Sequence, residues 1–506
     1  MLATLHAATL HGIESMPVEV QALFGKGIPE FDIVGLGDAA IRESRVRVKS
    51  ALESSGLTLP HRNVVLNLAP ADMRKSGSAL DLAIALALLC AGGITTMARL
   101  DGVLVLGELT LSGELRGVRG VLAHLRAAVQ RGITRAILPC SDAHEASLVG
   151  ECEVRCARTL RDVVQHLDGA LELPVARTQP SGERPGTTFD LRDVRGQQAA
   201  KRALEVAAAG MHNLLMVGPP GTGKTMLAQR MVTLLPPPTE EEALEIATIA
   251  TAIGNAAPTG LDRVERPFRA PHHSVSAAAL VGGGKPLRPG EVTVAHGGVL
   301  FLDELPEFGR VALEALRPTM ESGLALITRV HQSASWPARP LVLAAMNPCP
   351  CGYAEDPLRL CTCPVDRVER YRARISGPLL DRFDLHLALQ PVDARSLREG
   401  EPGDSSECVR ERVVRARQRA LERAVDAPST QQVIARFAAN TDADALALLD
   451  RSVDALGLSV RAYVKVLRVS RTIADLDGGD RVGLVHMAEA IQYRLLDRRI
   501  EPRRKR

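Results

Sequence analysis

The sequence predicts a multidomain α/β protein with three segments. At about 150 residues per domain, its 506 residues suffice for roughly three domains. Two stretches rich in Pro, Gly and Ser, 171–188 and 391–407, are expected to be linkers. The middle segment, 189–390, alternates apolar strands with helical stretches, as in a parallel sheet. It lies between an N-terminal segment, 1–170, and a C-terminal segment, 408–506.

The two outer segments differ in their periodicity. The first mixes short apolar strands with helical stretches, which predicts an α+β domain, and the third shows mainly helical periodicity. In the first segment, strands are expected at 64–68, 103–106 and 136–138 and a helix at 80–89. In the third segment, helices are expected at 409–425 and 461–473.

Composition and charge indicate an ordinary globular protein. The chain has 62 basic and 59 acidic side chains, a net charge of +3 and 46% hydrophobic residues, which excludes a disordered chain. Its longest apolar run, 82–94, has 13 residues, fewer than the roughly 18 that a membrane span needs. The N-terminus lacks a signal-peptide pattern, and the nine cysteines form no dense framework. We therefore expect a cytoplasmic protein without a membrane partner.

A phosphate-binding loop is the strongest signal in the chain. The apolar run 214–217 predicts a buried parallel strand, which leads through a glycine-rich loop into a helical stretch. The glycines let backbone N–H groups converge on phosphate oxygens, and the helix N-terminus adds its positive dipole. Lys224 would neutralise the β- and γ-phosphates, and the Thr225 hydroxyl would bind Mg²⁺. The residues predicted to bind ATP are Gly218, Pro219, Pro220, Gly221, Thr222, Gly223, Lys224 and Thr225.

Two further apolar strands end in polar residues that suit nucleotide hydrolysis. Asp303 and Glu304 follow one of them, 79 residues after Lys224. There Asp303 would bind Mg²⁺ and Glu304 would polarise the attacking water. Asn347 follows the other strand and would orient that water, the alternative being a turn-forming Asn before Pro348.

With Lys224, Asp303, Glu304 and Asn347 in this order, the middle segment resembles the AAA+ ATPases. The stretches LVLAAMNPCPCGY and YRARISGPLLDRFDL are similar to the magnesium-chelatase-like branch, and the whole chain resembles its ComM/YifB group. The resemblance implies an AAA+ P-loop parallel-sheet core, a C-terminal helical lid and a hexameric ring of identical subunits. It also implies an ATP hydrolase that acts as a DNA branch-migration helicase and promotes integration of transforming DNA in natural competence.

The same resemblance implies roles for two arginines. Arg382, in LLDRFD, matches the finger that one subunit supplies to its neighbour's nucleotide, with Asp381 where related helicases carry Ser. Arg461 matches the second sensor arginine on the C-terminal helical segment. An ordinary ion-pair arginine is the alternative for each. Lys285, at the tip of a loop insertion, and Arg329, in a hairpin, are candidate DNA contacts, with exposed loop charges as the alternative.

Two CxC pairs separated by nine residues follow Asn347 and are candidates for a structural zinc site. Four thiolates would close a tetrahedral Zn²⁺ site, with four reduced cysteines as the alternative. A closed shell leaves no position for substrate water, so this zinc would not be catalytic. His272 and His273 have no third ligand nearby in the sequence, and we interpret them as a subunit-contact loop. The proposed zinc ligands are Cys349, Cys351, Cys361 and Cys363.

Residues 61–140 resemble the proteolytic domain of Lon proteases, which carries a Ser–Lys dyad. Ser78 stands where the nucleophile would be, and His124 holds the position of the lysine. A serine needs a nearby base to become nucleophilic, and the missing lysine predicts that proteolysis has been lost. Ser78 is then expected to cap the helix that begins near Leu80.

Three functions compete at this point. The first is an ATP-driven motor on branched or duplex DNA, which basic runs at 410–423 and 494–506 favour. The second is a protein-remodelling or metal-chelatase-type motor without DNA activity, because such motors share the same ATPase core. The third, an ATP-dependent protease, depends on the N-terminal segment alone and is disfavoured by His124.

Overall fold

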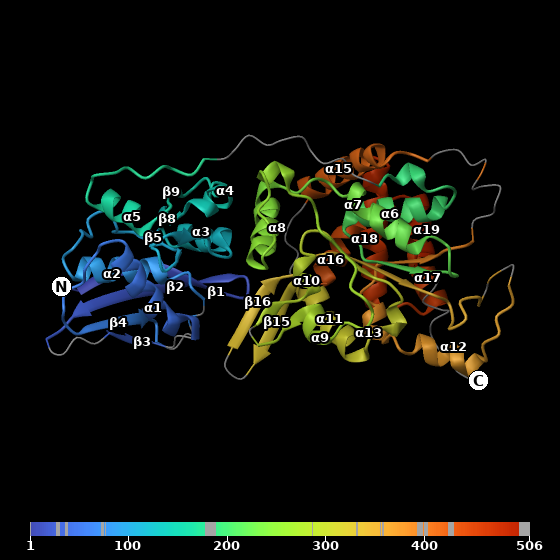
Figure 1. Cartoon of the computed structure of the whole chain (residues 1–506). Coiled ribbons are helices and arrows are strands. Elements are labelled where there is room, and N and C mark those ends of the chain that lie inside the picture. The colour runs from blue at the N-terminus through green and yellow to red at the C-terminus, as the bar shows by residue number, and fades with distance from the viewer. Residues whose placement is uncertain are drawn as a thin grey trace. The chain divides into compact units, whose positions relative to one another are not determined.

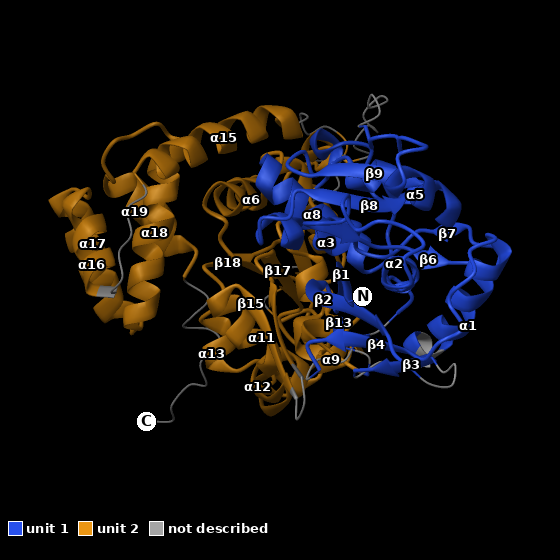
Figure 2. Ribbon diagram, turned by 90° about the vertical axis from the view of Figure 1, so that its left-hand side faces the viewer, with its two compact units in different colours: residues 1–184, 239–265, 285–288 blue, residues 185–238, 266–284, 289–506 orange. Residues whose placement is uncertain are grey.

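The computed structural model divides into two compact units (Figures 1 and 2). Unit 1 contains residues 1–184, 239–265 and 285–288, and unit 2 contains residues 185–238, 266–284 and 289–506. The structure describes residues 2–26, 31–35, 39–71, 75, 77–177, 189–285, 287–329, 332–354, 356, 359–391, 398, 403–423 and 430–494. Residues 239–265, which the sequence places in the middle segment, therefore fold with the N-terminal residues.

Unit 1 is built on a seven-stranded mixed sheet with the order β3-β4-β2-β1-β5-β8-β9. β1 (Leu2–His11) and β2 (Glu14–Phe24) form an antiparallel hairpin near its centre. β4 pairs antiparallel with β2, whereas β5 pairs in parallel with β1. The remaining strands are β3 (Phe31–Val34), β4 (Val64–Ala69), β5 (Val103–Val105), β8 (Arg135–Pro139) and β9 (Glu153–Ala157), with β6 (Glu108–Leu109) and β7 (Leu115–Arg116) as a separate ribbon.

The helices of unit 1 pack on this sheet, and α2 (Asp81–Ala91) is its central core element. All of its residues are buried, and it packs against β1 and β2, so it needs no polar face. α3 (Val121–Val129) lies between β2 and α8 (Glu240–Ala252). The other helices of four or more residues are α1 (Ala39–Ser54), α4 (Ala143–Ala146) and α5 (Leu160–Leu167). The predicted strands at 64–68, 103–106 and 136–138 and the helix at 80–89 are confirmed.

Unit 2 contains a five-stranded parallel sheet with the order β11-β14-β17-β10-β18. The strands are β11 (Phe268–Arg269), β14 (Val299–Leu302), β17 (Leu341–Met346), β10 (Leu214–Val217) and β18 (Leu385–Ala388). Alternate residues of β10 enter different cores: Leu214 and Met216 enter one and Leu215 enters the other. Both faces of the sheet are therefore covered, as parallel sheets require.

Helices form both covering layers of unit 2. On the Leu214 side the core includes α6 (Gln198–Gly210), α7 (Lys224–Leu234), α15 (Ser406–Glu422), α17 (Ala443–Leu456), α18 (Val460–Leu476) and α19 (Leu484–Gln492). On the Leu215 side it includes α9 (Ala277–Val281), α10 (Glu291–Val294), α11 (Arg310–Ser322) and α13 (Gly377–Leu380). The unit also contains α12 (Val365–Arg372), α16 (Thr430–Ala439) and the hairpin of β15 (Leu324–Arg329) and β16 (Gln332–Pro337). The short strands β12 (Gly282–Gly283) and β13 (Arg288–Pro289) form a separate two-stranded ladder.

The helices expected at 409–425 and 461–473 correspond to α15 and α18. Both contribute to the Leu214-side core, so the C-terminal helices and the parallel sheet share one hydrophobic core. Among the helices of the described residues, none is long and apolar enough to cross a membrane.

Candidate nucleotide site and cysteine cluster

The predicted phosphate loop joins β10 to α7 at the carboxyl edge of the parallel sheet. Gly221 and Gly223 have φ values of 79° and 83°, a left-handed backbone that only glycine adopts without strain. The Thr222 hydroxyl donates to the Pro219 carbonyl at 2.9 Å and holds the loop closed from within. Because α7 begins at Lys224, the free N–H groups of its first turn lie at the mouth of the loop, where phosphate oxygens would bind.

The Lys224 ammonium lies inside this loop. It donates to the carbonyls of Gly218 and Pro219 at 2.8 and 2.9 Å and to Asn347 Oδ1 at 3.2 Å. Burial lowers the pKa of Lys224, while the carboxylates of Asp303 and Glu304 act in the opposite direction. The Lys224 ammonium is partly desolvated, and its hydrogen-bond acceptors are neutral. Phosphate oxygens can therefore replace these acceptors when a nucleotide binds.

The two predicted magnesium ligands contact each other directly. Thr225 Oγ1 donates to Asp303 Oδ2 at 2.8 Å, and the other Asp303 oxygen accepts the Glu304 N–H at 2.9 Å. A hydroxyl and a carboxylate from two different elements thus point to one place beside the phosphate loop, as an oxygen-ligated Mg²⁺ requires. The structure therefore brings Lys224, Thr225, Asp303 and Asn347 together, from α7, β14 and β17.

Arg382 and Arg461 form a separate group in unit 2. Arg382 follows α13 and pairs with Glu321 of α11. Burial lowers the pKa of Arg382, and the charge of Arg461 adds to this effect, so the two guanidinium groups lie near each other. Arg461 is exposed at the start of α18. Among the described contacts of Lys224 and Thr225, neither arginine is a partner.

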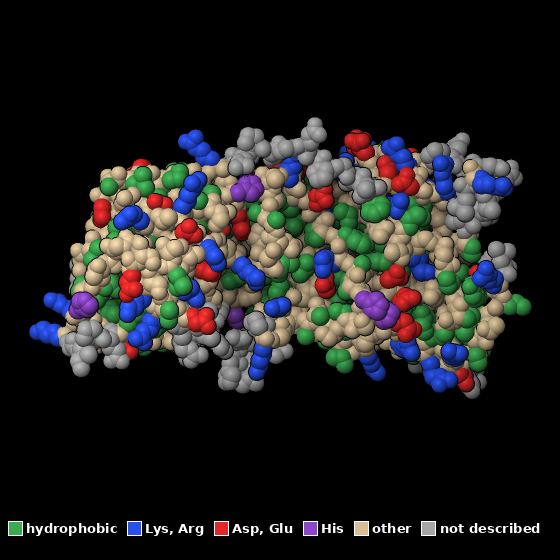
Figure 3. Space-filling model, viewed as in Figure 1, with side chains coloured by type: hydrophobic (Ala, Val, Ile, Leu, Met, Phe, Trp, Pro, Cys, Tyr) green, Lys and Arg blue, Asp and Glu red, His purple; other side chains and the backbone are tan. Residues whose placement is uncertain are grey.

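The structure describes the side chain of only one of the two residues predicted to contact DNA. Lys285 is exposed, whereas the side chain of Arg329, at the end of β15, lies outside the described residues. Arg412 of α15 pairs with Glu205 and Asp404, and Arg423, directly after α15, pairs with Asp475. Two charges of the 410–423 run are therefore neutralised within the chain. On the face in Figure 3, basic and acidic side chains are interspersed.

The first residue of the basic run at 494–506 is not available to DNA in the chain. Arg494 is 2% exposed, and its guanidinium donates to the Phe383 carbonyl at 2.8 Å. This arginine therefore belongs to the interior of unit 2 because a carbonyl and neighbouring side chains enclose it. The other basic residues of the run lie at 495–506, outside the described residues.

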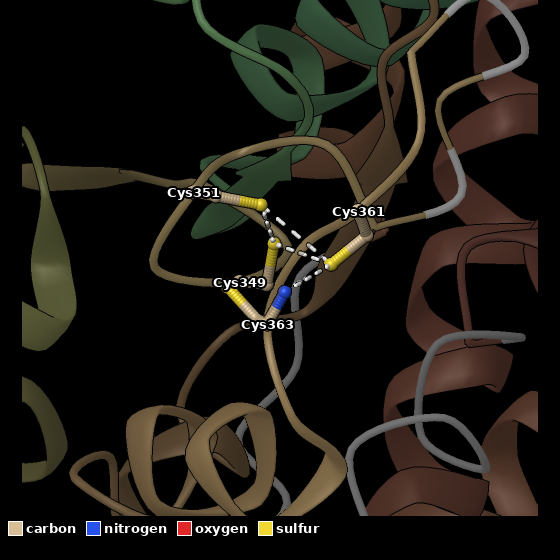
Figure 4. A group of neighbouring side chains, drawn as sticks. All are labelled: Cys349, Cys351, Cys361 and Cys363. Carbon is tan, nitrogen blue, oxygen red and sulfur yellow. Dashed lines mark hydrogen bonds between the residues drawn. The ribbon is translucent and has the colours of Figure 1, made fainter.

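The four cysteines of the two CxC pairs converge on one point (Figure 4). Their sulfur atoms all lie within 4.8 Å of one another, with Cys349 to Cys351 at 3.3 Å and both of these to Cys361 at 3.6 Å. A tetrahedral zinc with about 2.3 Å bonds to sulfur would need sulfur separations of about 3.8 Å. The backbone N–H groups of Ala354 and Cys363 donate to two of the sulfurs, at 3.2 and 3.4 Å. The donor set therefore fits a closed Cys₄ zinc site.

This cysteine loop, residues 349–363, lies directly against the phosphate loop. Gly352 has φ +87°, and a Cβ placed there would come within 2.5 Å of the Pro220 ring. At its start, the loop is continuous with Asn347, and Arg372 of α12 donates to the Pro348 carbonyl at 3.1 Å. The cysteine cluster thus fixes a segment that contacts the phosphate loop on one side and carries Asn347 on the other.

The Lon-like residues of unit 1 are not brought together. The Ser78 hydroxyl donates to the Glu108 carboxylate, whereas His124 Nδ1 lies 2.8 Å from Ser15 Oγ. Burial lowers the pKa of His124 to about 4, so the ring is neutral at physiological pH. The prediction that Ser78 caps a helix is wrong: α2 starts at Asp81 after Leu80, with no side-chain cap, because Glu108 takes the serine hydroxyl.

The sequence motifs predicted the residues of the phosphate-loop cluster, Lys224, Thr225, Asp303 and Asn347, but they did not predict two contacts beside it. His273 Nδ1 lies 3.3 Å from Glu304 Oε2, and Gly352 touches Pro220. Neither pair is joined by spacing or periodicity, so no local pattern indicates the contact. Among the described residues, the group of His, Cys, Asp and Glu side chains that could hold a metal ion is the cysteine quartet, and it does not include His272 or His273.

Comparisons with known proteins agree with this arrangement. The family description "Magnesium chelatase, subunit ChlI" matches residues 190–397, "Subunit ChlI of Mg-chelatase" matches 18–142, and "Magnesium chelatase, subunit ChlI C-terminal" matches 403–494. Competence protein ComM of Haemophilus influenzae is 42% identical over 99% of both chains. Protein YifB of Salmonella typhimurium is 42% identical over 98% of both chains. Lon protease 2 of Bacillus subtilis is 28% identical over 28% of this chain and 27% of its own.

A parallel sheet with a phosphate loop, an Asp-Glu strand and an Asn-bearing strand defines an AAA+ protein of the magnesium-chelatase type. Within that class, full-length identity of 42% places this chain in the ComM/YifB group, and the chain belongs to that group.

Proposed function

We propose that this protein is an ATP-driven motor that works as a hexameric ring in the cytoplasm and drives branch migration of DNA during natural competence. The observation that carries the proposal is 42% identity to competence protein ComM over 99% of the chain. The proposal builds on the membership of the chain in the magnesium-chelatase family of AAA+ ATPases.

The described contacts assign a task to each residue of the cluster. Bound Mg²⁺-ATP supplies the phosphoryl group to be transferred, and Thr225 and Asp303 would hold its metal. Lys224 would bind the β- and γ-phosphates in place of its present carbonyl partners. Glu304 would accept the proton of the attacking water, and Asn347, which already contacts Lys224, would orient that water.

Arg382 and Arg461 would act at the junction of neighbouring subunits. Because Arg382 pairs with Glu321 and not with the Lys224 cluster of its own chain, it suits a finger for the nucleotide of the next subunit. Arg461, close to Arg382, would act as the second sensor from the C-terminal helices, which form the lid of the AAA+ core. In the single chain the Arg382 side chain is 10% exposed, and its buried Nε has no hydrogen-bond partner among the described residues.

The grip on DNA would be electrostatic, with Lys285 and Arg329 as candidate phosphate contacts. Few aromatic side chains are available for base stacking, since they make up 3% of the sequence. Binding should therefore weaken with salt, with log K falling by about 0.9 per neutralised phosphate.

We propose that a structural zinc ion is held by four cysteines: Cys349, Cys351, Cys361 and Cys363. Four free thiols in a reducing compartment remain available to a metal, and the sulfur separations suit Zn²⁺. Metal analysis of untagged protein purified without chelator should find about one zinc per chain. Cys361→Ser and Cys363→Ser should lower that content, whereas Cys408→Ser, at an isolated exposed cysteine, should not.

For unit 1 we propose a Lon-protease-like domain without proteolysis. The contacts of Ser78 with Glu108 and of His124 with Ser15 support this, because neither residue activates the other.

The experiment that tests the motor compares ATP hydrolysis without DNA, with duplex DNA and with a four-way junction. The junction should stimulate hydrolysis, and junctions with homologous arms should be converted into strand-exchange products. Lys224→Ala should bind the junction without converting it, because nucleotide hydrolysis supplies the work. No stimulation and no conversion by wild type at any salt or ATP concentration would favour the protein-remodelling or chelatase-type motor instead.

A further inference from the structure

A partly buried ion pair binds the residues that directly follow Arg382 in the chain. Lys465 Nζ, in α18, lies 3.0 Å from Asp384 Oδ1, and the two side chains are 17% and 20% exposed. The same ammonium donates to the Phe383 carbonyl at 3.2 Å. One lysine of the C-terminal helices therefore binds both residues that come after Arg382.

The backbone around Arg382 is also bound by two other parts of unit 2. Asn213, directly before β10, donates from Nδ2 to the Arg382 carbonyl at 3.1 Å. Its backbone N–H donates to Asp384 Oδ2 at 2.8 Å, so both oxygens of that carboxylate are engaged. Arg494 joins Lys465 in donating to the Phe383 carbonyl, at 2.8 Å. The carbonyls at 382 and 383 thus accept from three side chains, and the backbone that carries the Arg382 guanidinium has a defined position.

The helix that carries Lys465 also carries Arg461. Arg461 precedes Lys465 by one helical turn in α18, and residues at this spacing lie on the same face of a helix, about 6 Å apart along its axis. Burial lowers the pKa of Arg382, and the charge of Arg461 adds to this effect, which agrees with that placement. The contacts of Lys465 with Phe383 and Asp384 therefore join the first turn of α18 to the Arg382 backbone.

Stability alone does not require an ion pair at this place. α18 already packs through Val466, Val469 and Ile473 into the Leu214-side core. A buried ion pair loses hydration and is often no more stabilising than apolar side chains of similar volume. What the pair adds is direction, because charge-assisted hydrogen bonds fix both the distance and the angle between two groups. The pair of Lys465 and Asp384 therefore suits a task in which geometry matters.

We propose that Lys465 is a positioning residue for ATP hydrolysis: it joins α18 to the Arg382 backbone, so that the guanidinium groups of Arg382 and Arg461 keep a fixed separation. This role rests on the proposed function of Arg382 as a finger for the next subunit's nucleotide. Lys465 itself binds no nucleotide, because its ammonium is already held by a carboxylate and a carbonyl. Donors that are fixed before the reaction stabilise developing charge without reorganisation, so a shift of the Arg382 backbone should slow the chemical step.

The first test compares Lys465 variants in ATP hydrolysis by the full chain without DNA. Lys465→Met keeps the aliphatic part of the side chain and loses the charge, and it should lower kcat about 10- to 100-fold with KM changed less than about twofold. Lys465→Arg keeps the charge and should recover much of the loss. Arg468→Met, at an exposed basic residue of the same helix, is the matched control and should stay within about twofold of wild type. Wild-type kcat in Lys465→Met would overturn the role.

Mixing experiments identify the subunit that Lys465 serves. An equal mixture of Lys465→Met and Lys224→Ala proteins should hydrolyse ATP several-fold faster than the average of the two separate proteins, because some interfaces then contain an intact Lys224 and an intact Lys465. The mixture of Arg382→Ala with Lys224→Ala is the reference. A gain in the reference without a gain for Lys465→Met would overturn the Lys465 role alone. No gain in either mixture would overturn the finger assignment and this role together, and absence of hydrolysis by wild type would overturn the ATPase assignment as well.

A double variant separates positioning from a loss of stability. Lys465→Met leaves the Asp384 carboxylate without its cation, which by itself destabilises a fold. Lys465→Met combined with Asp384→Asn removes both charges, and the asparagine oxygen can still accept the Asn213 N–H. The melting temperature of this double variant should be closer to that of wild type than the melting temperature of Lys465→Met, whereas kcat should stay about 10- to 100-fold low. Recovery of wild-type kcat together with the melting temperature would show that Lys465 only stabilises the fold, and it would overturn the positioning role.

Discussion

The phosphate-loop edge of unit 2 and the Ser78 region of unit 1 both have polar residues near the start of a helix that packs on a sheet. In unit 2, Lys224 and Thr225 reach Asn347 and Asp303, which follow neighbouring parallel strands. In unit 1, Ser78 bonds to Glu108 of the small ribbon, and His124 faces Ser15 of the hairpin. The difference is one of topology: the carboxyl ends of parallel strands deliver side chains to one edge, whereas unit 1 scatters its polar residues over separate elements.

This contrast suggests that the two regions respond to substitution in different ways. At the phosphate-loop edge each polar side chain serves the same ligand, so a change there should alter catalysis more than stability. In unit 1 each polar side chain has its own buried or local partner, so a change should alter stability and leave hydrolysis intact. A substitution in unit 1 that strongly lowers the rate of ATP hydrolysis would contradict this division.

The largest effect is expected for Arg382. An arginine supplied from a neighbouring subunit is worth about 10³–10⁵ in rate for related phosphoryl transfers, so Arg382→Ala should nearly abolish hydrolysis. Mixing it with Lys224→Ala protein should restore part of the activity, because some mixed interfaces contain one intact Lys224 and one intact Arg382. The measurement is ATPase rate against mixing ratio under ring-forming conditions. Normal hydrolysis by Arg382→Ala alone would remove the finger assignment.

The next largest effect is expected for Gly352→Ala, which tests the contact between the cysteine loop and the phosphate loop. In Gly352→Ala the new methyl group would lie 2.5 Å from Pro220 Cδ, so one loop must move. We expect KM for ATP to rise about 10-fold, because the phosphate loop is displaced before nucleotide binds. Gly457→Ala is the matched control, since Gly457 also has positive φ, +65°, but nothing lies within 4 Å of its Cβ position. Equal KM values for the two variants would show that the contact does not affect the nucleotide site.

The same two regions show what the sequence could and could not foresee. The strand, glycine loop and helix around Lys224 are consecutive in the chain, so a local pattern defines them, and parallel pairing then adds Asp303 and Asn347. The hairpin of β1 and β2 was not foreseen, because its alternating residues include His, Thr and Ser, which weaken the apolar period. The packing of α8 in unit 1 is tertiary and leaves no local trace.

Single-residue assignments were the least predictable. The Ser78 hydroxyl could bond either to the backbone at the start of α2 or to the Glu108 carboxylate, 30 positions away. It bonds to Glu108. Arg494 stands at the head of a basic run, yet it is buried because a carbonyl of the loop after α13 accepts from it. His273 meets Glu304 through strand pairing that no spacing in the sequence indicates. In each case the decisive partner is remote in the chain.

The buried His124 gives a stability effect with a defined pH dependence. Its pKa is about 4 in the folded state, below the ordinary 6.5, so the unfolded chain binds more protons between these values. This contribution to stability is complete above about pH 6.5 and is lost as the pH falls toward about 4, amounting to about 3 kcal/mol at most. Urea unfolding between about pH 7.5 and about pH 5 should show a smaller pH slope for His124→Gln than for wild type. His61→Gln, at an exposed histidine, should keep the wild-type slope.

The smallest effect is expected for Ser78→Ala. The substitution removes one hydrogen bond to the half-buried Glu108, which should lower the free energy of unfolding by about 1 kcal/mol or less. ATP hydrolysis should stay within about twofold of wild type, because nothing in the contacts of Ser78 reaches the phosphate loop. The Ser78 hydroxyl donates to a carboxylate, which does not make it a strong nucleophile, so Ser78 should also resist a fluorophosphonate probe. Stoichiometric labelling of wild type that disappears in Ser78→Ala would show an activated nucleophile, and the division between a catalytic unit 2 and a purely structural Ser78 would then be wrong.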